Sequence, residues 1–294
     1  MSDHNYLLKL IIDAVEETIE GHAEVSGIVV SGGLDSSTVA CVAHRLGWDL
    51  PLFTGFYAEP GFSEVPYAEM VPGGFHHLIE IRPEDFVEHF DAMAAALRPP
   101  YQGMGAFGQY MVGRYIAQNT PVKRVLSGEG SDELFGGYAR LMAVAGHPLP
   151  DGYENYVVPA DYPRTVPEAI QYDYDRLPDL LAVDDQCMAA HGLEALAPFT
   201  DERVVAFAHG LGYQDRIGKT FLRQTVRGLV PDAIIDRTDK MGFPVPLAKW
   251  AESNGDVATF IHDRIGFLPD AEKPWDRKWW YEMLEATNRE PAAA

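Results

Sequence analysis

The sequence predicts an α/β fold, in which a parallel sheet with helices on both faces is followed by a mainly helical C-terminal part. Strand-like and helix-like patterns alternate in the first half of the 294 residues, as in parallel sheets. Two glycine-rich loops each follow a strand candidate, and helical patterns dominate after residue 167. These three observations favour an open sheet with a ligand site at its strand ends.

Apolar side chains recur at helical spacing in residues 6–19, which predicts an N-terminal amphipathic helix. Short apolar runs that predict strands cover residues 27–30, 52–57, 76–81 and 122–126. One further helix is expected from the first glycine loop to about residue 46, and others over residues 85–97, 109–118, 177–190, 203–209 and 219–229. Proline, glycine, aspartate and tyrosine mark residues 146–167 as an irregular connection.

The first glycine loop, residues 31–37 (SGGLDSS), lies between a predicted strand and a predicted helix. Gly32 and Gly33 let backbone N–H groups approach an anion, and the helix start adds free N–H donors. The Ser31 and Ser36 hydroxyls add further donors. The carboxylate of Asp35 would repel a phosphate unless a cation such as Mg²⁺ lay between them. A plain turn with an acidic helix start is the alternative for this loop alone.

The second glycine loop, residues 127–138 (SGEGSDELFGGY), follows the strand predicted over residues 122–126. Its Asp132 is the matching oxygen ligand for a metal shared with Asp35. Gly128 is expected to leave room for a nucleotide at the strand end. Two such loops together predict one phosphate and metal site.

Three other motifs resemble binding motifs but do not predict a binding site. Residues 103–108 fit G-x-G-x-x-G but do not follow a strand, and Gly218 to Thr220 lacks the glycine spacing of a Walker A loop. His76 and His77 are adjacent in a strand, so they point to opposite faces and do not suit one metal ion.

The formal net charge of −21 argues against binding of a nucleic-acid backbone, which needs clustered Lys and Arg. The two cysteines, Cys41 and Cys187, are far apart and predict neither a zinc site nor a disulfide framework. No signal peptide and no membrane-spanning apolar run are expected, which predicts a cytoplasmic protein without a membrane partner.

The SGGLDSS loop resembles the pyrophosphate-binding PP-loop of ATP pyrophosphatases, and SGEGSDELFGGY is similar to the signature of the synthetase domain of asparagine synthetases. Residues 181–201, residues 219–223 and residues 237–246 with Trp250 resemble later segments of that family, in the same order. The resemblance implies a PP-loop nucleotide-binding part over residues 1–145 and a mainly helical part over residues 146–294, which together form one integrated synthetase domain.

The resemblance also implies the chemistry. ATP is split between the α- and β-phosphates when a substrate carboxylate attacks, and an amine then displaces AMP from the acyl-adenylate. Asp35 and Asp132 would hold Mg²⁺, and the first loop with Gly128 would hold the nucleotide. Lys240 matches the catalytic lysine of the family, allowing for one inserted residue, and Lys219 is a second candidate for phosphate contact.

Glu129 stands where the amide-forming members of the family carry glutamate, and it is expected to accept a proton from the attacking amine. Its alternative is a helix N-terminal carboxylate that interacts with the helix dipole. The two interpretations are compatible.

The sequence departs from the family in several places. Residue 2 is serine, where the glutaminase domain would carry cysteine, so the amine is expected to be free ammonia, ammonia from a separate glutaminase or carrier partner, or another amine. Leu196 stands in place of an arginine, and residues 99–110 match poorly, so aspartate is not established as the acid.

Two other functions stay open from the sequence. One is a PP-loop enzyme that adenylates another oxygen, as in nucleotide or tRNA modification. The other is a catalytically silent ATP-binding subunit, which the joint presence of Asp35, Asp132, Glu129 and Lys240 disfavours.

Overall fold

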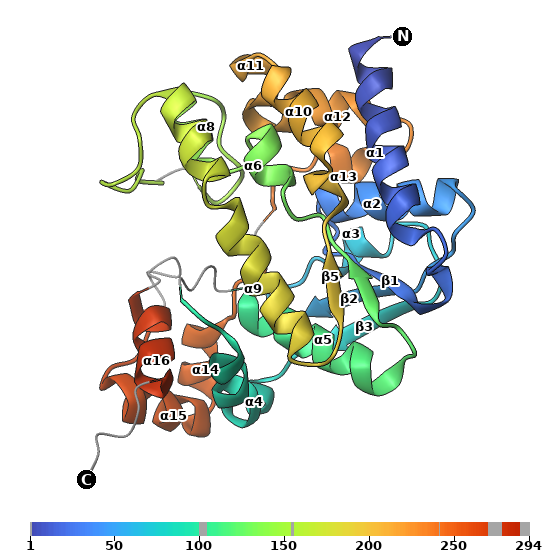
Figure 1. Cartoon of the computed structure of the whole chain (residues 1–294). Helices are drawn as coiled ribbons and strands as arrows, with labels where there is room; N and C mark the ends of the chain where they lie inside the picture. The colour runs from blue at the N-terminus through green and yellow to red at the C-terminus, as the bar shows by residue number, and fades with distance from the viewer. Residues whose placement is uncertain (1, 100–104, 154–155, 241, 270–277, 289–294) are drawn as a thin grey trace.

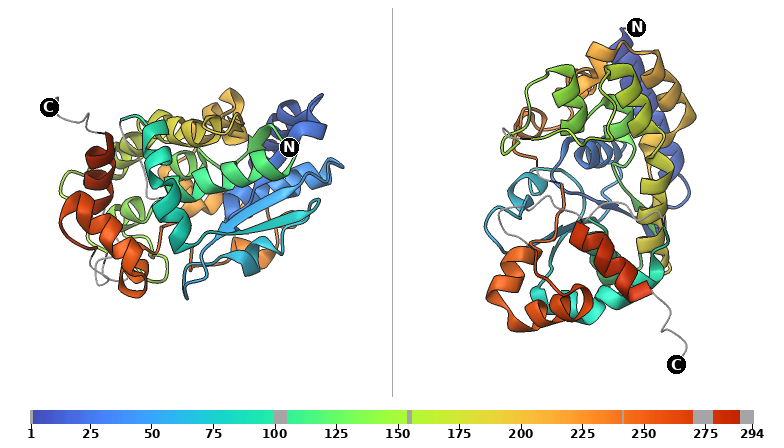
Figure 2. Two further views of the ribbon diagram at one scale, coloured as in Figure 1. Left: turned by 90° about the horizontal axis from the view of Figure 1, so that it is seen from below. Right: turned by 90° about the vertical axis from the view of Figure 1, so that its left-hand side faces the viewer.

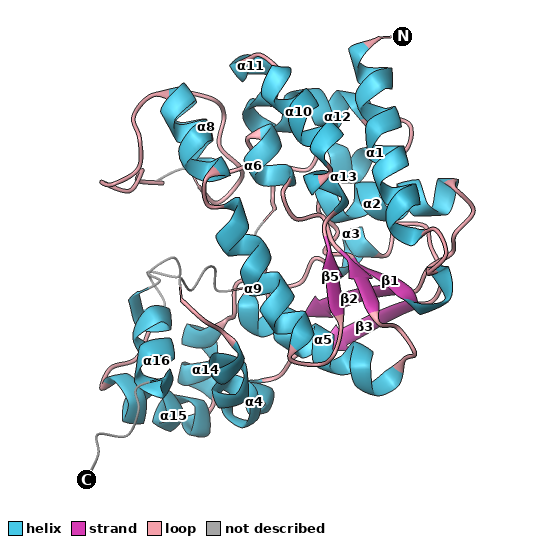
Figure 3. Ribbon diagram, in the orientation of Figure 1, coloured by secondary structure: helices cyan, strands magenta, loops and turns pink. Residues whose placement is uncertain are grey.

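The fold is built on five parallel strands in the order β3-β2-β1-β4-β5 (Figures 1 and 3). The computed structural model describes residues 2–99, 105–153, 156–240, 242–269 and 278–288. Ile28 of β1 aligns with Leu52 of β2 on one side and with Leu126 of β4 on the other, which makes β1 the central strand of the sheet. The strands are β1 (Ser26–Val29), β2 (Leu52–Phe56), β3 (His76–Glu80), β4 (Arg124–Leu126) and β5 (Glu194–Leu196).

Helices cover both faces of this sheet (Figure 2). On one face, α1 (Asp3–Ile19) and α2 (Leu34–Arg45) bury side chains such as Leu10 and Val39 against Ile28, Leu52 and Leu126. On the other face, α5 (Ala106–Asn119) and α9 (Leu177–Ala189) pack on the sheet with the side chains of Val112, Ile116, Met188, Phe53 and Val125. Because strand side chains alternate between the faces, Ile28 and Phe53 serve opposite layers.

A separate aromatic core lies among the C-terminal helices, away from the N-terminus (Figure 1). Helices α14 (Leu247–Ser253), α15 (Gly255–Ile265) and α16 (Lys278–Asn288) pack around α4 (Pro83–Ala96). Edge-to-face ring contacts join Phe86 with Trp250 and Phe90 with Trp280. The C-terminal segment is thereby anchored to a helix from the first third of the chain.

The remaining elements are short helices around the site-bearing edge of the sheet. The α-helices are α3 (Val65–Ala68), α6 (Ser131–Phe135), α7 (Ala139–Ala145), α8 (Val166–Tyr174), α10 (Glu202–Gly210), α11 (Tyr213–Arg216), α12 (Thr220–Thr225) and α13 (Asp232–Ile235). The 3₁₀ turns are η1 (Ala23–Val25), η2 (Pro198–Thr200) and η3 (Ile217–Lys219). Within the described residues, no helix combines the length and apolar character needed to cross a bilayer.

The predicted fold class is confirmed, and the four predicted strands form within one residue of their expected ends, except that β4 begins two residues later. The single helix predicted over residues 219–229 is wrong: α12 ends at Thr225, and Lys219 has a left-handed backbone with φ of 60°. The short edge strand β5 was not predicted. It comes from the second half of the chain and pairs with β4, so both predicted parts contribute to one sheet.

A substitution at Gly108 of α5 can test how tightly the side chains beside the strand ends are packed. A Cβ at this position would overlap the ring of Phe243, which also lies against Gly55. Ala for Gly in a helix ordinarily stabilises by about 0.5–1 kcal/mol, but here overpacking should reverse the sign. We expect Gly108→Ala to lower the free energy of unfolding by about 1–3 kcal/mol in urea titrations.

Gly210→Ala is the matched control, because Gly210 is also helical and has no atom within 4 Å of an added Cβ. It should be neutral or slightly stabilising. Equal stabilisation of both variants would contradict the tight packing of Phe243.

Candidate active site

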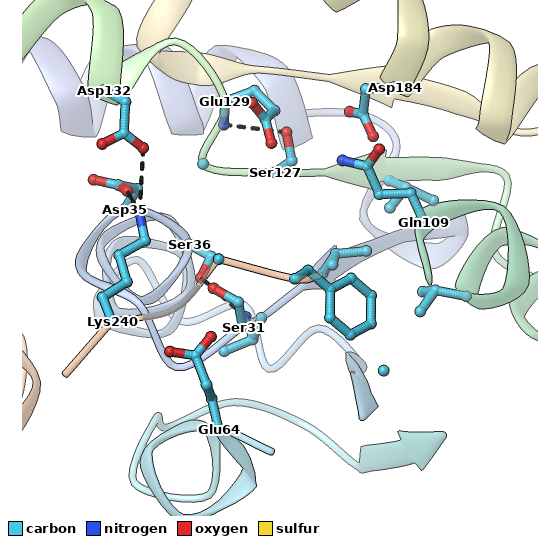
Figure 4. Close-up of a pocket in the computed structure, with 18 of the residues that line it drawn as sticks. Ser31, Asp35, Ser36, Glu64, Gln109, Ser127, Glu129, Asp132, Asp184 and Lys240 are labelled. Carbon is cyan, nitrogen blue, oxygen red and sulfur yellow. Dashed lines mark hydrogen bonds and ion pairs between the residues drawn. The ribbon is translucent and has the colours of Figure 1, made fainter. Parts of the chain in front are cut away.

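The first glycine loop connects the end of β1 to the start of α2 (Figure 4). Gly32 has φ of 76°, a conformation that favours glycine, and Gly33 is the N-cap of α2 with no side-chain cap. The Ser31 hydroxyl accepts a hydrogen bond from the Gly33 N–H at 3.2 Å and lies 3.2 Å from the Ser36 hydroxyl. The helix start therefore presents backbone donors of the kind that bind anions.

The second glycine loop follows β4 and leads into α6. Gly128 lies against the backbone of the first loop, and an added Cβ would come within 2.5 Å of the Ser36 nitrogen. Gly130 has φ of 89° and begins α6. The missing side chain at Gly128 lets the two loops touch, and contact of Gly128 with a nucleotide stays a prediction.

A partly buried cluster of four charged side chains joins the two loops. Lys219 Nζ donates to Asp35 Oδ1 and Oδ2 at 2.7 and 2.6 Å, and lies 2.7 Å from Asp132 Oδ1. Lys240 Nζ lies 3.2 Å from Asp132 Oδ2 and 3.4 Å from Asp35 Oδ2. The Ser131 hydroxyl donates to Asp35 Oδ1 at 2.7 Å. Two carboxylates and two ammonium groups thus balance each other, with Asp35 and Lys219 buried and Asp132 and Lys240 partly exposed.

The charges within the cluster shift the pKa values of its members. Burial opposes the charge of Asp132, but Lys219 and Lys240 outweigh it and hold the pKa of Asp132 well below its usual range. Burial likewise opposes the charge of Lys240, yet Asp132, Asp35 and Glu64 raise the pKa of this lysine above its usual value. Both groups remain charged at neutral pH.

Local backbone features place Lys219 in the cluster. Among the described residues, Lys219 is the only non-glycine residue with positive φ, and Gly218 before it also has positive φ, at 67°. Gly137 lies so close to the Lys219 and Asp132 side chains that an added Cβ would overlap both. A strained backbone held in this way is typical of functional sites.

Arg237, in the C-terminal part of the chain, contacts the first loop and residues beside it. Its guanidinium donates to the Gly32 carbonyl at 3.1 Å and lies 2.7 Å from Glu64 Oε1. It also contacts Asp239 at 2.9 Å and stacks 3.8 Å above the Tyr67 ring. The sequence pattern predicted no role for Arg237, because its partners Gly32 and Glu64 lie far away along the chain.

A cavity of about 290 Å³ extends from the charge cluster along the carboxyl ends of β1 and β4. Its polar lining is labelled in Figure 4 and comprises Ser31, Asp35, Ser36, Glu64, Gln109, Ser127, Glu129, Asp132, Asp184 and Lys240. Valine, methionine and phenylalanine side chains form much of the rest, from β1, β4, α5, α9 and residue 243. The charge cluster closes one end of this cavity.

Carboxyl groups accumulate beside the cavity. Burial, reinforced by Asp184 and Glu133, raises the pKa of Glu129 to about 8. Burial and the neighbouring Asp132 raise the pKa of Glu133 to about 7, and its carboxylate accepts a hydrogen bond from Tyr138. Burial and Asp185 raise the pKa of Asp184 to about 6. A carboxyl group with a pKa near 8 is matched to proton transfer at neutral pH.

The structure brings together all the candidate residues named from the sequence: Ser31, Gly32, Gly33, Asp35, Ser36, Gly128, Glu129, Asp132, Lys219 and Lys240. It adds Glu64, Gln109, Asp184 and Arg237, of which Asp184 lies in the family-like segment 181–188. Within the poorly matching segment 99–110, residues 100–104 lie outside the described residues. Met241, next to Lys240, also lies outside them.

Asp35 and Asp132 are suited to bind a metal ion. Both point oxygen atoms at one ammonium group, that of Lys219, so a cation already lies between them. Within the described ranges, no group of three or more His, Cys, Asp or Glu side chains could hold a metal. Two carboxylates completed by substrate phosphates are the ligand set that Mg²⁺ prefers.

A parallel sheet with glycine loops meeting outside the ends of β1 and β4 defines an open α/β protein with a site at its topological switch point. The family model for asparagine synthase matches residues 7–154 and 163–291. The chain therefore belongs to the asparagine synthase family.

Individual relatives agree with this membership. Asparagine synthetase [glutamine-hydrolyzing] 1 of Bacillus subtilis is 24% identical over 329 residues, covering 86% of this chain and 52% of the relative. The asparagine synthetase [glutamine-hydrolyzing] of Gallus gallus is 29% identical over 245 residues, covering 78% and 41%. The chain spans about half the length of the curated relatives it matches.

Among solved structures, NMN synthetase from Francisella tularensis is similar with a TM-score of 0.41 and 14% identity, covering 100% of this chain and 99% of that one.

The raised carboxyl pKa values predict a pH-dependent stability. A carboxyl group whose pKa is higher in the folded state stabilises the fold while protonated, and this contribution is lost as pH rises through the folded pKa. We expect the unfolding temperature to fall by a few degrees between pH 6.5 and 8.5, where Glu129 and Glu133 lose protons. Histidines with lowered pKa values act in the opposite direction only below this window.

Glu129→Gln should flatten this slope in scanning calorimetry, because the variant has no proton to lose at that position. Glu252→Gln, on the exposed side of α14, is the control and should keep the slope. An unchanged slope in Glu129→Gln would contradict the raised pKa.

Proposed function

We propose that the chain is an ATP-dependent amide ligase that adenylates a substrate carboxylate and transfers the acyl group to ammonia or another amine. Pyrophosphate leaves in the first step and AMP in the second. The observation that carries this proposal is the convergence of both glycine loops on the cluster of Asp35, Asp132, Lys219 and Lys240. This cluster lies at one end of a cavity that Glu129 also lines.

The first loop supports binding of the pyrophosphate portion of ATP. Gly33 caps α2 without a side-chain hydrogen bond, so first-turn N–H groups are free to bind an anion. Lys219 and Lys240 lie beside this helix start, and phosphate oxygens would replace carboxylate oxygens as their partners. Lys240 would then stabilise charge that develops on the α-phosphate.

Asp35 and Asp132 are the residues that would hold Mg²⁺. The ion would neutralise negative charge on the pyrophosphate leaving group. Arg237 holds the first loop through its hydrogen bond to the Gly32 carbonyl, and Gly128 lets the second loop lie against the first, which keeps the two carboxylates close together.

Glu129 is the candidate base for the second step. An attacking amine must lose a proton to form an amide, and a half-buried carboxylate with a pKa near 8 can accept it. Because Glu129 precedes Asp132 by three residues, the loop that holds the phosphate end also holds the base near the reacting carbonyl. A separate glutaminase or carrier that delivers ammonia belongs to the same proposal.

Pyrophosphate exchange into ATP tests the first step directly. We expect exchange with at least one acid in a panel that includes aspartate, and a fall of at least 100-fold in Asp35→Asn, because the loss of one carboxylate unbalances the charge cluster. Exposed Asp263→Asn on α15 is the control and should keep full exchange. No exchange with any acid would count strongly against the proposal.

Glu129→Gln separates the two steps. Exchange should remain within a few-fold of the wild type, while amide formation in single-turnover assays should fall by about 10²–10⁴-fold, the usual contribution of a general base. The wild-type rate of amide formation should rise with pH through about 8, as Glu129 loses its proton. An equal loss of both steps would remove the base assignment.

A further inference from the structure

The two edge strands of the sheet differ in how well they are protected against pairing with another chain (Figure 3). At one edge, β5 has only three residues, and its exposed Glu194 is ion-paired with Arg124 at 2.9 Å. At the other edge, β3 has five residues, contains neither proline nor lysine, and carries a charged side chain only at its last residue, Glu80. Short length, charge, lysine and proline are the usual means by which proteins keep edge strands from pairing. By these criteria β5 is protected and β3 is open.

The outer edge of β3 offers a regular set of free backbone groups. The Leu52 N–H donates to the Phe75 carbonyl at 3.0 Å, and the Ile81 N–H donates to the Phe56 carbonyl at 2.9 Å. Because the backbone groups of successive strand residues alternate between the two edges, the odd-numbered residues of β3 face β2, and residues 76, 78 and 80 face outward. No described strand pairs with β3 on this outer side. The outward N–H and carbonyl groups are therefore available to another strand.

Exposed apolar side chains accompany these free backbone groups. Phe75, directly before β3, is 74% exposed, and Leu78 in the middle of β3 is 41% exposed. The Phe75 ring contacts the His77 ring edge-to-face at 4.7 Å, and the His77 ring stacks on Phe53 at 4.8 Å. Exposed apolar side chains beside an unpaired strand edge mark a surface that is suited to association.

The distribution of charge favours a second copy of this chain as the partner. The chain has a formal net charge of −21, so most of its surface repels another copy. In residues 70–82, by contrast, Glu80 and Arg82 are the only Asp, Glu, Lys or Arg side chains, and they are ion-paired at 3.0 Å. Two copies can therefore approach each other through this neutral segment.

We propose that β3 pairs antiparallel with β3 of a second copy, so that one sheet continues through both copies. A two-fold axis beside Leu78 places this residue opposite Leu78 of the second copy. His76 then lies opposite Glu80 of the second copy, on the same face of the sheet as Leu78. A parallel arrangement would instead place the two Glu80 side chains near each other.

The proposed register also pairs every outward backbone group of β3. Residue 78 pairs with residue 78, and residue 76 pairs with residue 80, each by exchange of two hydrogen bonds. Any other antiparallel register leaves part of these groups without a partner. Because antiparallel pairing reverses the strand direction, the two candidate active sites lie at opposite ends of the joined sheet. Each copy keeps its own cavity, so the pairing does not depend on the proposed function.

Opposite charges at residue 78 test the two-fold arrangement. Sedimentation velocity of the wild type over about 1–200 µM should show a shift from monomer to dimer. Leu78→Lys and Leu78→Glu should each weaken self-association at least about 10-fold, because like charges then lie directly opposite each other. An equimolar mixture of the two variants should recover association to within a few-fold of the wild type, because opposite charges then meet.

Leu268→Lys and Leu268→Glu are the matched controls, because Leu268 is an exposed leucine, at 45%, that lies after α15 and outside β3. Both should keep the association of the wild type. Circular dichroism confirms the folding of each variant.

Hydrogen exchange of the wild type tests the register without any substitution. The amides of His76, Leu78 and Glu80 should exchange quickly in dilute solution and at least about 10-fold more slowly at concentrations where the dimer forms. The amides of His77 and Ile79 face β2 and should exchange slowly at both concentrations. This alternation is expected only if the outer edge of β3 becomes paired, and it decides the matter if a variant does not fold.

Three results would overturn the proposal. One is a wild type that stays monomeric at all concentrations, which would indicate that any partner of β3 is a strand of another protein. The second is association that persists in both single Leu78 variants, because another surface would then join the copies. The third is failure of the mixture to recover association, which would contradict a two-fold axis beside Leu78.

Discussion

The partly buried ion cluster of Asp35, Asp132, Lys219 and Lys240 is the contact on which the site depends. It joins two loops at the ends of β1 and β4 to two turns of the C-terminal half. A single charge in this place would be strongly destabilising, and only the mutual pairing of two carboxylates and two ammonium groups makes their burial tolerable. The missing side chains at Gly128 and Gly137 and the left-handed backbone of Lys219 are conditions for this close approach.

The two ends of the cavity next to the cluster differ in charge. At the loop end, cations and carboxylates are balanced, and in the proposed reaction a phosphate would replace the carboxylates as partner of the lysines. Further along, Glu129 and Asp184 form an acidic stretch, in which burial raises the pKa of Glu129 to about 8 and that of Asp184 to about 6. This distribution of charge suits the proposed reaction, which releases pyrophosphate at one end and removes a proton further along. The overall acidity of the chain does not explain it, because the pattern arises from individual buried groups.

Strong local patterns were the most predictable part of the fold. The helix over residues 6–19 and the strands over 52–57 and 76–81 have clear apolar periodicity, and they form nearly as expected. β5 has only three residues, among them the exposed Glu194, and it becomes a strand because β4 offers it free backbone partners. The helix predicted over residues 219–229 begins only at Thr220, because Lys219 has a left-handed backbone, and it ends at Thr225, before Gly228 with φ of 83°. The division into parts at residue 145 stays a prediction, although the sheet takes strands from both sides of it.

The sequence by itself determined the two glycine loops and the chemistry they can support, because strand, glycine turn and helix start are contiguous and their preferences are local. It also indicated Asp35, Asp132, Glu129 and Lys240, through motifs that resemble a known family. The tertiary structure decided which of these groups meet: Lys219 and Lys240 reach Asp35 across 184 and 205 residues of chain. It also decided that Gln109, Asp184 and Arg237 lie at the site. Such contacts depend on how distant helices pack on the sheet, and no local pattern encodes that packing.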